Sequence, residues 1–124
     1  MKSDELKPIE VGYGEDKVIF HCRMITVAEE ETYDQKFNDI ADSDSEKYTK
    51  QYDVCRSALG EFSSAMPEKW VKAKGEKKKE ALPGETPISA IDAYFKERTA
   101  KNERIIRTAF RLFKAQLDPD VSFL

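Results

Sequence analysis

The chain has 124 residues, of which 40% are hydrophobic and 36% are charged, and its formal net charge is −3. This length suits a single domain with one hydrophobic core under a heavily charged surface. No segment approaches the roughly 18 apolar residues of a membrane span, and the polar start from Met1 to Pro8 lacks the apolar run of a secretory signal. We therefore expect a cytoplasmic protein with no membrane partner.

The net charge conceals a difference between the two halves of the chain. Residues 1–53 contain fourteen acids and seven bases, whereas residues 54–124 contain ten acids and fourteen bases, so the halves carry −7 and +4. Such a split indicates either internal pairing of an acidic element with a basic one, or separate faces for different partners or for other copies of the chain.

The first quarter of the chain predicts a β-hairpin. Residues 1–7 are expected to form a frayed tail. Apolar and polar residues then alternate over 9–13 and again over 17–25, and the turn sequence Gly14-Glu15-Asp16 separates the two runs. In the second run, one face is shared by Val18, Phe20, Cys22 and Met24.

Two helices are predicted next. Thr26 and Glu29 have the spacing of a capping box, which indicates a helix over about 27–41. A second helix of about five turns is predicted over 48–66, because one continuous apolar stripe runs through Tyr48, Tyr52, Cys55, Leu59, Phe62 and Met66.

The segment 72–85 is lysine-rich and contains two glycines and a proline, which favours a solvated or mobile loop. Thr86-Pro87 is typical of a helix start. Apolar positions from Ile88 to Phe113 then continue to about Gln116, with a polar interruption over 98–102 that leaves one long helix or two shorter ones open. Asp118-Pro119 ends the helix, and 118–124 forms a C-terminal tail. The predicted fold is α+β, mainly α, in a single domain 1–124: an N-terminal β-hairpin followed by three or four helices.

The residues that usually carry catalysis are sparse. His21 and Cys22 are adjacent on a predicted strand, so they point to opposite faces and cannot form a catalytic pair. Cys22 and Cys55 are expected to be buried free thiols. The cysteines and the one histidine lack the tight spacing of a zinc site. We therefore predict a non-enzymatic protein with no metal and no cofactor.

Candidate binding residues fall into two groups. Arg104, Arg107, Arg111 and Lys114 have the spacing of one helical stripe, which would dock an acidic protein surface or form a solvated face. Nucleic acid is less favoured because the sequence pI is about 5.3. The second group consists of large apolar side chains in less regular segments, which either anchor a partner or pack in the core or tail: Trp70, Phe95, Phe123 and Leu124.

The order of these features resembles the tail assembly chaperones of long-tailed bacteriophages, over about residues 17–117. The resemblance rests on a strand leading into a Thr-capped acidic helix (Phe20 to Glu31), a second helix with Leu59 and Phe62 that runs into Trp70, a polar loop from Gly75 to Pro87, and a helix that opens with Ile88, Ile91, Tyr94 and Phe95. It rests on order and spacing, not on an invariant motif. It implies a protein that binds the tape measure protein in the host cytoplasm, assists assembly of the tail tube and self-associates. It implies no catalytic residue.

Two alternatives from other classes remain at the level of sequence. One is a small acidic phage or bacterial regulator that inhibits an enzyme or a nucleic-acid machine, although such mimics of nucleic acid usually carry more negative charge than −3. The other is a structural protein of the head–tail junction, which would assemble permanently.

Overall fold

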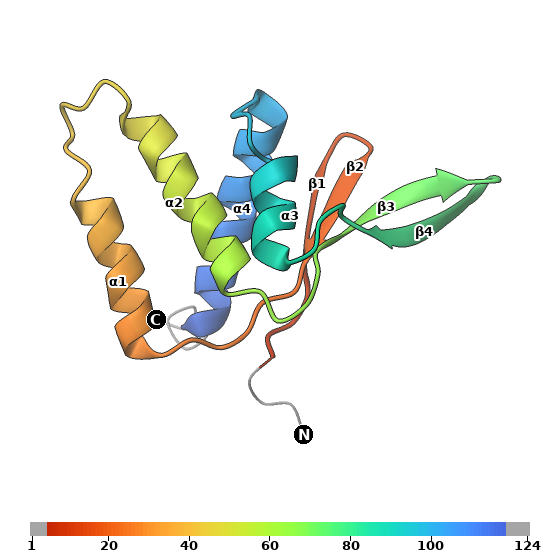
Figure 1. Cartoon of the computed structure of the whole chain (residues 1–124), viewed down its shortest axis with the longest axis horizontal. Coiled ribbons are helices and arrows are strands. Elements are labelled where there is room, and N and C mark those ends of the chain that lie inside the picture. Colours follow the sequence, from red (N-terminus) through yellow and green to blue (C-terminus); the bar gives the residue numbers. More distant parts are fainter. Residues whose placement is uncertain (1–4, 119–124) are drawn as a thin grey trace.

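A computed structural model describes residues 5–118 of the chain (Figure 1). These residues form one antiparallel sheet in the order β1-β2-β3-β4, together with four helices. The elements follow the chain as β1 (Ile9–Tyr13), β2 (Asp16–Phe20), α1 (Val27–Asn38), α2 (Lys47–Glu61), β3 (Glu68–Ala73), β4 (Glu76–Ala81), α3 (Pro87–Tyr94) and α4 (Ala100–Leu117). The predicted α+β class with an N-terminal hairpin is confirmed.

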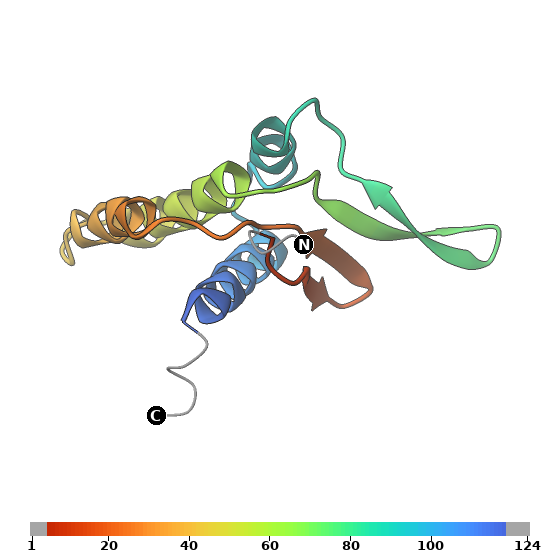
Figure 2. The ribbon, with the colours of Figure 1, turned by 90° about the horizontal axis from the view of Figure 1, so that it is seen from below.

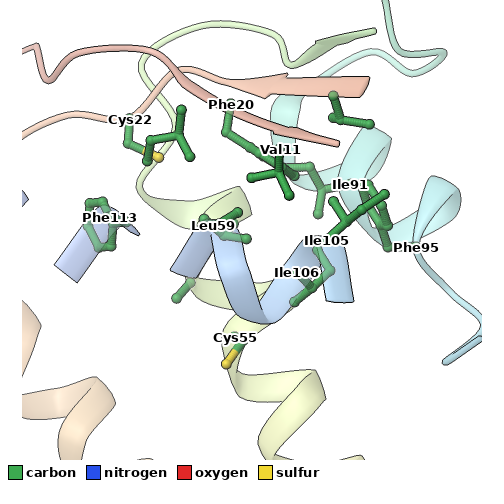
Figure 3. Packing of buried hydrophobic residues seen from close by; sticks show 14 of the residues in the cluster. Val11, Phe20, Cys22, Cys55, Leu59, Ile91, Phe95, Ile105, Ile106 and Phe113 are labelled. Atoms are coloured by element: carbon green, nitrogen blue, oxygen red, sulfur yellow. The ribbon is translucent and has the colours of Figure 1, made fainter. Parts of the chain in front are cut away.

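The hairpin of β1 and β2 supplies the sheet's contribution to the core. The strands pair with Val11 opposite Val18, and a turn at Gly14, whose φ is +64°, joins them. Val18 and Phe20 belong to the main core cluster, whereas the intervening Ile19 is buried outside it. Figure 3 shows Val11 and Phe20 pointing from the strands toward α4. The regular strand ends at Phe20, earlier than the predicted Ile25, although Cys22 still forms an isolated bridge with Ser63.

The helix α1 begins at the predicted capping box, because the Thr26 side chain accepts from the Glu29 amide and the Glu29 carboxylate accepts from the Thr26 amide. The helix α2 ends at Glu61, before the predicted end at Met66. The reason is a change of hydrogen-bond partner. Ser64 N donates to His21 O at 2.8 Å, and Arg23 N donates to Phe62 O at 2.9 Å, so the backbone after α2 pairs with the end of the first hairpin.

The prediction of a loop over 72–85 is wrong. Most of that segment belongs to a second hairpin, in which β3 and β4 pair over all six residues of each strand. The turn at Lys74 and Gly75 has φ values of 54° and 82°, as expected for a tight hairpin turn. This hairpin joins β2 only at its base, through Val18 opposite Lys69 and Ile19 opposite Glu68. Figures 1 and 2 show it projecting from the body of the molecule. We call residues 68–81 the arm.

The C-terminal region contains two helices, which settles the alternative left by the sequence. Thr86 caps α3 through Ser89, and Pro87 occupies the first turn. The break falls at Phe95 to Thr99, because Thr99 starts α4 by accepting from the Asn102 amide at 3.1 Å. The Asn102 side chain in turn donates to Glu97 O at 2.9 Å and holds the link between the helices.

The helix α4 lies at the centre of the core, between the first hairpin and α2 (Figures 2 and 3). Its buried side chains Ile105, Ile106, Ala109 and Phe113 meet the sheet on one side and α2 on the other. Three predicted stripe positions of α2, namely Tyr52, Cys55 and Leu59, are buried, and so is Phe62 at its C-cap, but Tyr48 is 60% exposed. Both cysteines are buried and free, as predicted.

The predicted frayed tail is held to the body over residues 5–7. Leu6 N donates to Cys22 O at 2.9 Å, and Lys7 exchanges two hydrogen bonds with the Gln116 side chain. Residues 1–4 and 119–124 lie outside the described part of the chain, so the predicted C-terminal tail falls there apart from Asp118.

Candidate functional site

The predicted basic stripe of α4 divides into two pairs with different surroundings. Arg104 and Arg111 are exposed. Arg107 instead contacts α2, where its guanidinium donates to Tyr48 O at 3.1 Å and to Gln51 Oε1 at 3.3 Å. Lys114 contacts α1, with Nζ 2.6 Å from Glu30 Oε2 and 3.3 Å from Asp34 Oδ1. Arg107 and Lys114 therefore hold α4 to α2 and to α1, and only Lys114 does so through acidic side chains.

The helix α1 contacts the rest of the molecule through few side chains. Tyr33 is its one buried residue, and the Tyr33 ring meets the Phe62 ring edge-on at 4.9 Å while its hydroxyl donates to Glu61. The half-buried Phe37 lies 5.7 Å from the ring of Phe110 on α4. A surface helix of a globular protein usually buries three or four residues in every two turns. With one buried residue, against five in α2, two in α3 and five in α4, α1 is the least buried helix of the described chain.

Ion pairs hold the first half of α1 to the rest of the molecule. At its start, Arg23 lies 2.9 Å from Glu29, and the hydrogen bond from this guanidinium, followed by that from the Thr26 amide, lowers the pKa of Glu29 to about 2. Lys114 contacts Glu30 in the first turn of α1 and Asp34 in its middle. Burial lowers the pKa of Lys114, but the hydrogen bonds to these two carboxylates outweigh that effect and raise it. α1 is thus attached by two aromatic contacts and by ion pairs in its first half.

Trp70 lies in β3 at the root of the arm and is half-buried. Its indole Nε1 donates to Glu10 Oε1 at 3.3 Å, across β2, and Lys79 Nζ lies 5.4 Å from its ring centroid. Beyond the two paired positions at the base, β2 and β3 diverge and leave an open groove. Its walls are formed by Glu10, Glu15, Asp16 and Lys17 on one side and by Trp70, Val71, Lys72 and Lys77 on the other.

The other predicted anchors do not form a common surface with Trp70. Phe95 is 0% exposed and packs 5.9 Å from the Phe20 ring, so it belongs to the core and offers no surface to a partner. The expectation that it anchors a partner is corrected by this burial. Phe123 and Leu124 lie outside the described residues.

The chemically reactive side chains are held in structural contacts. His21 Nε2 lies 2.8 Å from Glu68 Oε1, which links the end of β2 to the start of β3. Burial raises the pKa of Cys22 to about 12 and that of Cys55 to about 11. Both thiols therefore stay protonated at neutral pH, when a nucleophile would need the thiolate.

In the part of the chain from Glu5 to Asp118, no three His, Cys, Asp or Glu side chains gather to hold a metal ion. Over the same residues, no helix has the length and apolar character to cross a membrane.

Comparison with protein-family models, with curated proteins and with solved structures found no match for this chain. Two features of the surface were missed by reasoning from the sequence. The weak burial of α1 depends on tertiary contacts. The arm was missed because β4 has the sequence EKKKEA, without apolar alternation, although the turn residues Lys74-Gly75 were a usable signal.

Proposed function

We propose that this chain is a non-catalytic tail assembly chaperone of a long-tailed bacteriophage. In this role it binds the tape measure protein in the host cytoplasm, keeps it in solution, and assists assembly of the tail tube. The order of elements in the sequence suggests the family, and the weak burial of α1 supports the activity.

The observation that carries the proposal is the accessible apolar side of α1. Phe37 on α1 and Ile40, two residues past its end, are half-buried, and the Phe37 ring lies 5.7 Å from that of the half-buried Phe110 of α4. A chaperone for a long apolar helix needs a surface on which that helix can place its own apolar stripe. The half-buried apolar side chains where α1 meets α4 offer such a surface. The charged residues around them keep the complex in solution.

The position of the reactive groups agrees with a non-catalytic role. Both thiols are buried with raised pKa values, and the histidine serves as a link between two strands. Each of these groups contributes to packing or pairing in the fold.

The test is co-expression of the full chain with the tape measure protein of the same phage, followed by co-purification. We expect the tape measure protein to be soluble only in the presence of the chain. The double substitution F37A/I40A should weaken the complex by about tenfold or more, since two apolar contacts are lost.

The matched control is I88A, because Ile88 is 52% exposed on α3, away from α1. It should leave binding unchanged, and circular dichroism should show that all variants remain folded. A tape measure protein that stays insoluble with the chain present, or equal binding by F37A/I40A and the wild type, would contradict the proposal.

A further inference from the structure

The lysines of the arm differ from the other basic residues of the molecule. The arm contains six lysines and three glutamates. Across residues 5–118, lysines such as Lys47, Lys50, Lys101 and Lys114 form ion pairs, but no arm lysine does. The arm therefore keeps a net positive charge, and none of its lysines is held in an ion pair within the described chain.

One cross-strand pair in the arm works against the stability of the hairpin. Lys72 and Lys77 lie directly opposite each other, on the same face as Trp70 and Lys79. Like charges in directly opposed positions destabilise a sheet. A carboxylate placed between these ammonium groups would reverse the sign of that interaction, so the arm gains most from an acidic partner.

The opposite end of the molecule carries the complementary charge. Residues 27–46, which include α1 and the loop after it, contain eight acids and one lysine. Figures 1 and 2 show this region and the arm at the two ends of the long axis. Several of the acids are paired internally, but Glu31 on α1 and Asp39 at its C-cap are exposed and form no ion pair in the described chain.

The two surfaces also match in length. A six-residue strand of the arm spans about 20 Å, and the twelve residues of α1 span about 18 Å. The arm can therefore lie along α1 for the full length of both elements.

From this match of charge and length, we propose that the arm of one copy docks on the outer face of α1 of a second copy. Lys77 and Lys79, which share one face of β4, then face Glu31 and Asp39 of the neighbour. Because the two surfaces lie at opposite ends of the same chain, the contact is head-to-tail and produces rings or open chains of copies. This association does not depend on which client the protein binds.

The first experiment measures the assembly of the full chain by sedimentation velocity at low and high salt. We expect assemblies larger than a dimer at about 0.02 M salt, and their dissociation at about 0.5 M salt, where charges more than a few ångströms apart are screened. A protein that stays monomeric at low salt up to high concentration overturns the proposal.

Charge reversal identifies the surfaces. The variants K77E/K79E, on the arm, and E31K/D39K, on α1, should each weaken self-association by at least about tenfold, because like charges then meet at the contact. Mixing the two variants should restore assembly, since the acidic arm of the first fits the basic helix of the second, and the remaining native surfaces fit each other. The control R104E/R111E reverses two exposed charges of α4 and should leave assembly unchanged.

Trp70 provides an independent readout, because it is the single tryptophan of the chain and lies at the root of the arm. Its fluorescence should change on assembly and recover at high salt. Failure of the mixed variants to assemble would overturn the proposal. Quenching of Trp70 fluorescence by a single-stranded oligothymidylate that competes with self-association would also overturn it. That result would show that the arm binds nucleic acid.

Discussion

The two hairpins of this protein share a topology but have different environments. In the first, Ile9, Val11, Val18, Ile19 and Phe20 are buried, and α4 covers one face. In the second, every residue of β4 is exposed, and the hairpin joins the sheet through two residue pairs at its base. One hairpin therefore helps to build the core, and the other displays charge. Four comparisons between variants test that division, and the largest effect is expected in the first.

The largest difference should follow from truncating one side chain in each hairpin. Phe20 is 0% exposed and contacts Phe95, so F20A should lower the free energy of unfolding by about 3–5 kcal/mol through lost burial and the cavity left behind. K78A, on the exposed β4, should change it by less than about 0.5 kcal/mol. Urea unfolding measures both. Comparable losses in the two variants would show that the arm contributes to the core.

The first hairpin should also make stability depend on alkaline pH through Cys22. Burial raises the pKa of this thiol from 9.0 to about 12. The unfolded state therefore loses its proton first, so the stabilisation is complete below pH 9.0 and is lost as the pH rises through the folded pKa. The slope from this one group is at most about 1.4 kcal/mol per pH unit. Unfolding curves of C22A should show a smaller slope than the wild type over that range, and an unchanged slope would refute the assignment.

The turn glycines offer a matched pair of substitutions. Gly14 and Gly75 have φ values of +64° and +82°, where alanine costs about 1–2 kcal/mol. G14A should lower the global free energy of unfolding, because its hairpin belongs to the core. G75A should instead accelerate hydrogen exchange in the arm alone, since local opening of β4 leaves the core intact. An equal loss in the global free energy of unfolding of G14A and G75A would contradict this separation. So would slower global refolding of both variants.

The smallest effect concerns the opposed lysines of the arm. K77E replaces a like-charged pair with Lys72 by an opposite-charged one, so it should stabilise the arm by about 0.2–1 kcal/mol. The gain should appear as slower amide exchange in β3 and β4 at low salt and disappear at high salt. K74E, at the turn and outside the paired positions, is the control and should leave exchange in the strands largely unchanged.

Elements with an apolar period were predictable from the sequence. The alternation from Ile9 to Phe20 and the stripe from Tyr52 to Phe62 reflect burial in the core, whereas the capping box at Thr26 reflects hydrogen bonds at a helix start. Each element formed close to its predicted place, although the second strand, α1 and α2 end earlier than predicted. The end of α2 was misplaced because the backbone of Ser64 bonds to His21, a contact between residues far apart in the sequence. Apolar periodicity indicates which residues are buried. It does not indicate which of two backbone hydrogen-bond partners a residue takes.

The candidate site was less predictable than the fold. The stripe from Arg104 to Lys114 was identified correctly as one helical series, but only the structure shows that Lys114 faces Glu30 while Arg111 remains exposed. Phe95 was equally ambiguous in the sequence, because a bulky residue at a helix end fits a core as well as a docking surface. The structure places it in the core. The arm is held by backbone pairing and not by burial. Its exposed strand β4 therefore lacks the apolar alternation from which a strand is predicted.

The charged outer edge of β4 has a consequence for the behaviour of the protein at high concentration. An unpaired strand edge is a template on which other strands can add, and it is a common starting point for aggregation. Lysine at three successive positions, Lys77 to Lys79, makes this edge repel an identical edge. The same residues that leave the arm without internal partners therefore guard the sheet against growth by strand addition, so neutralising them should make the chain prone to form fibrils.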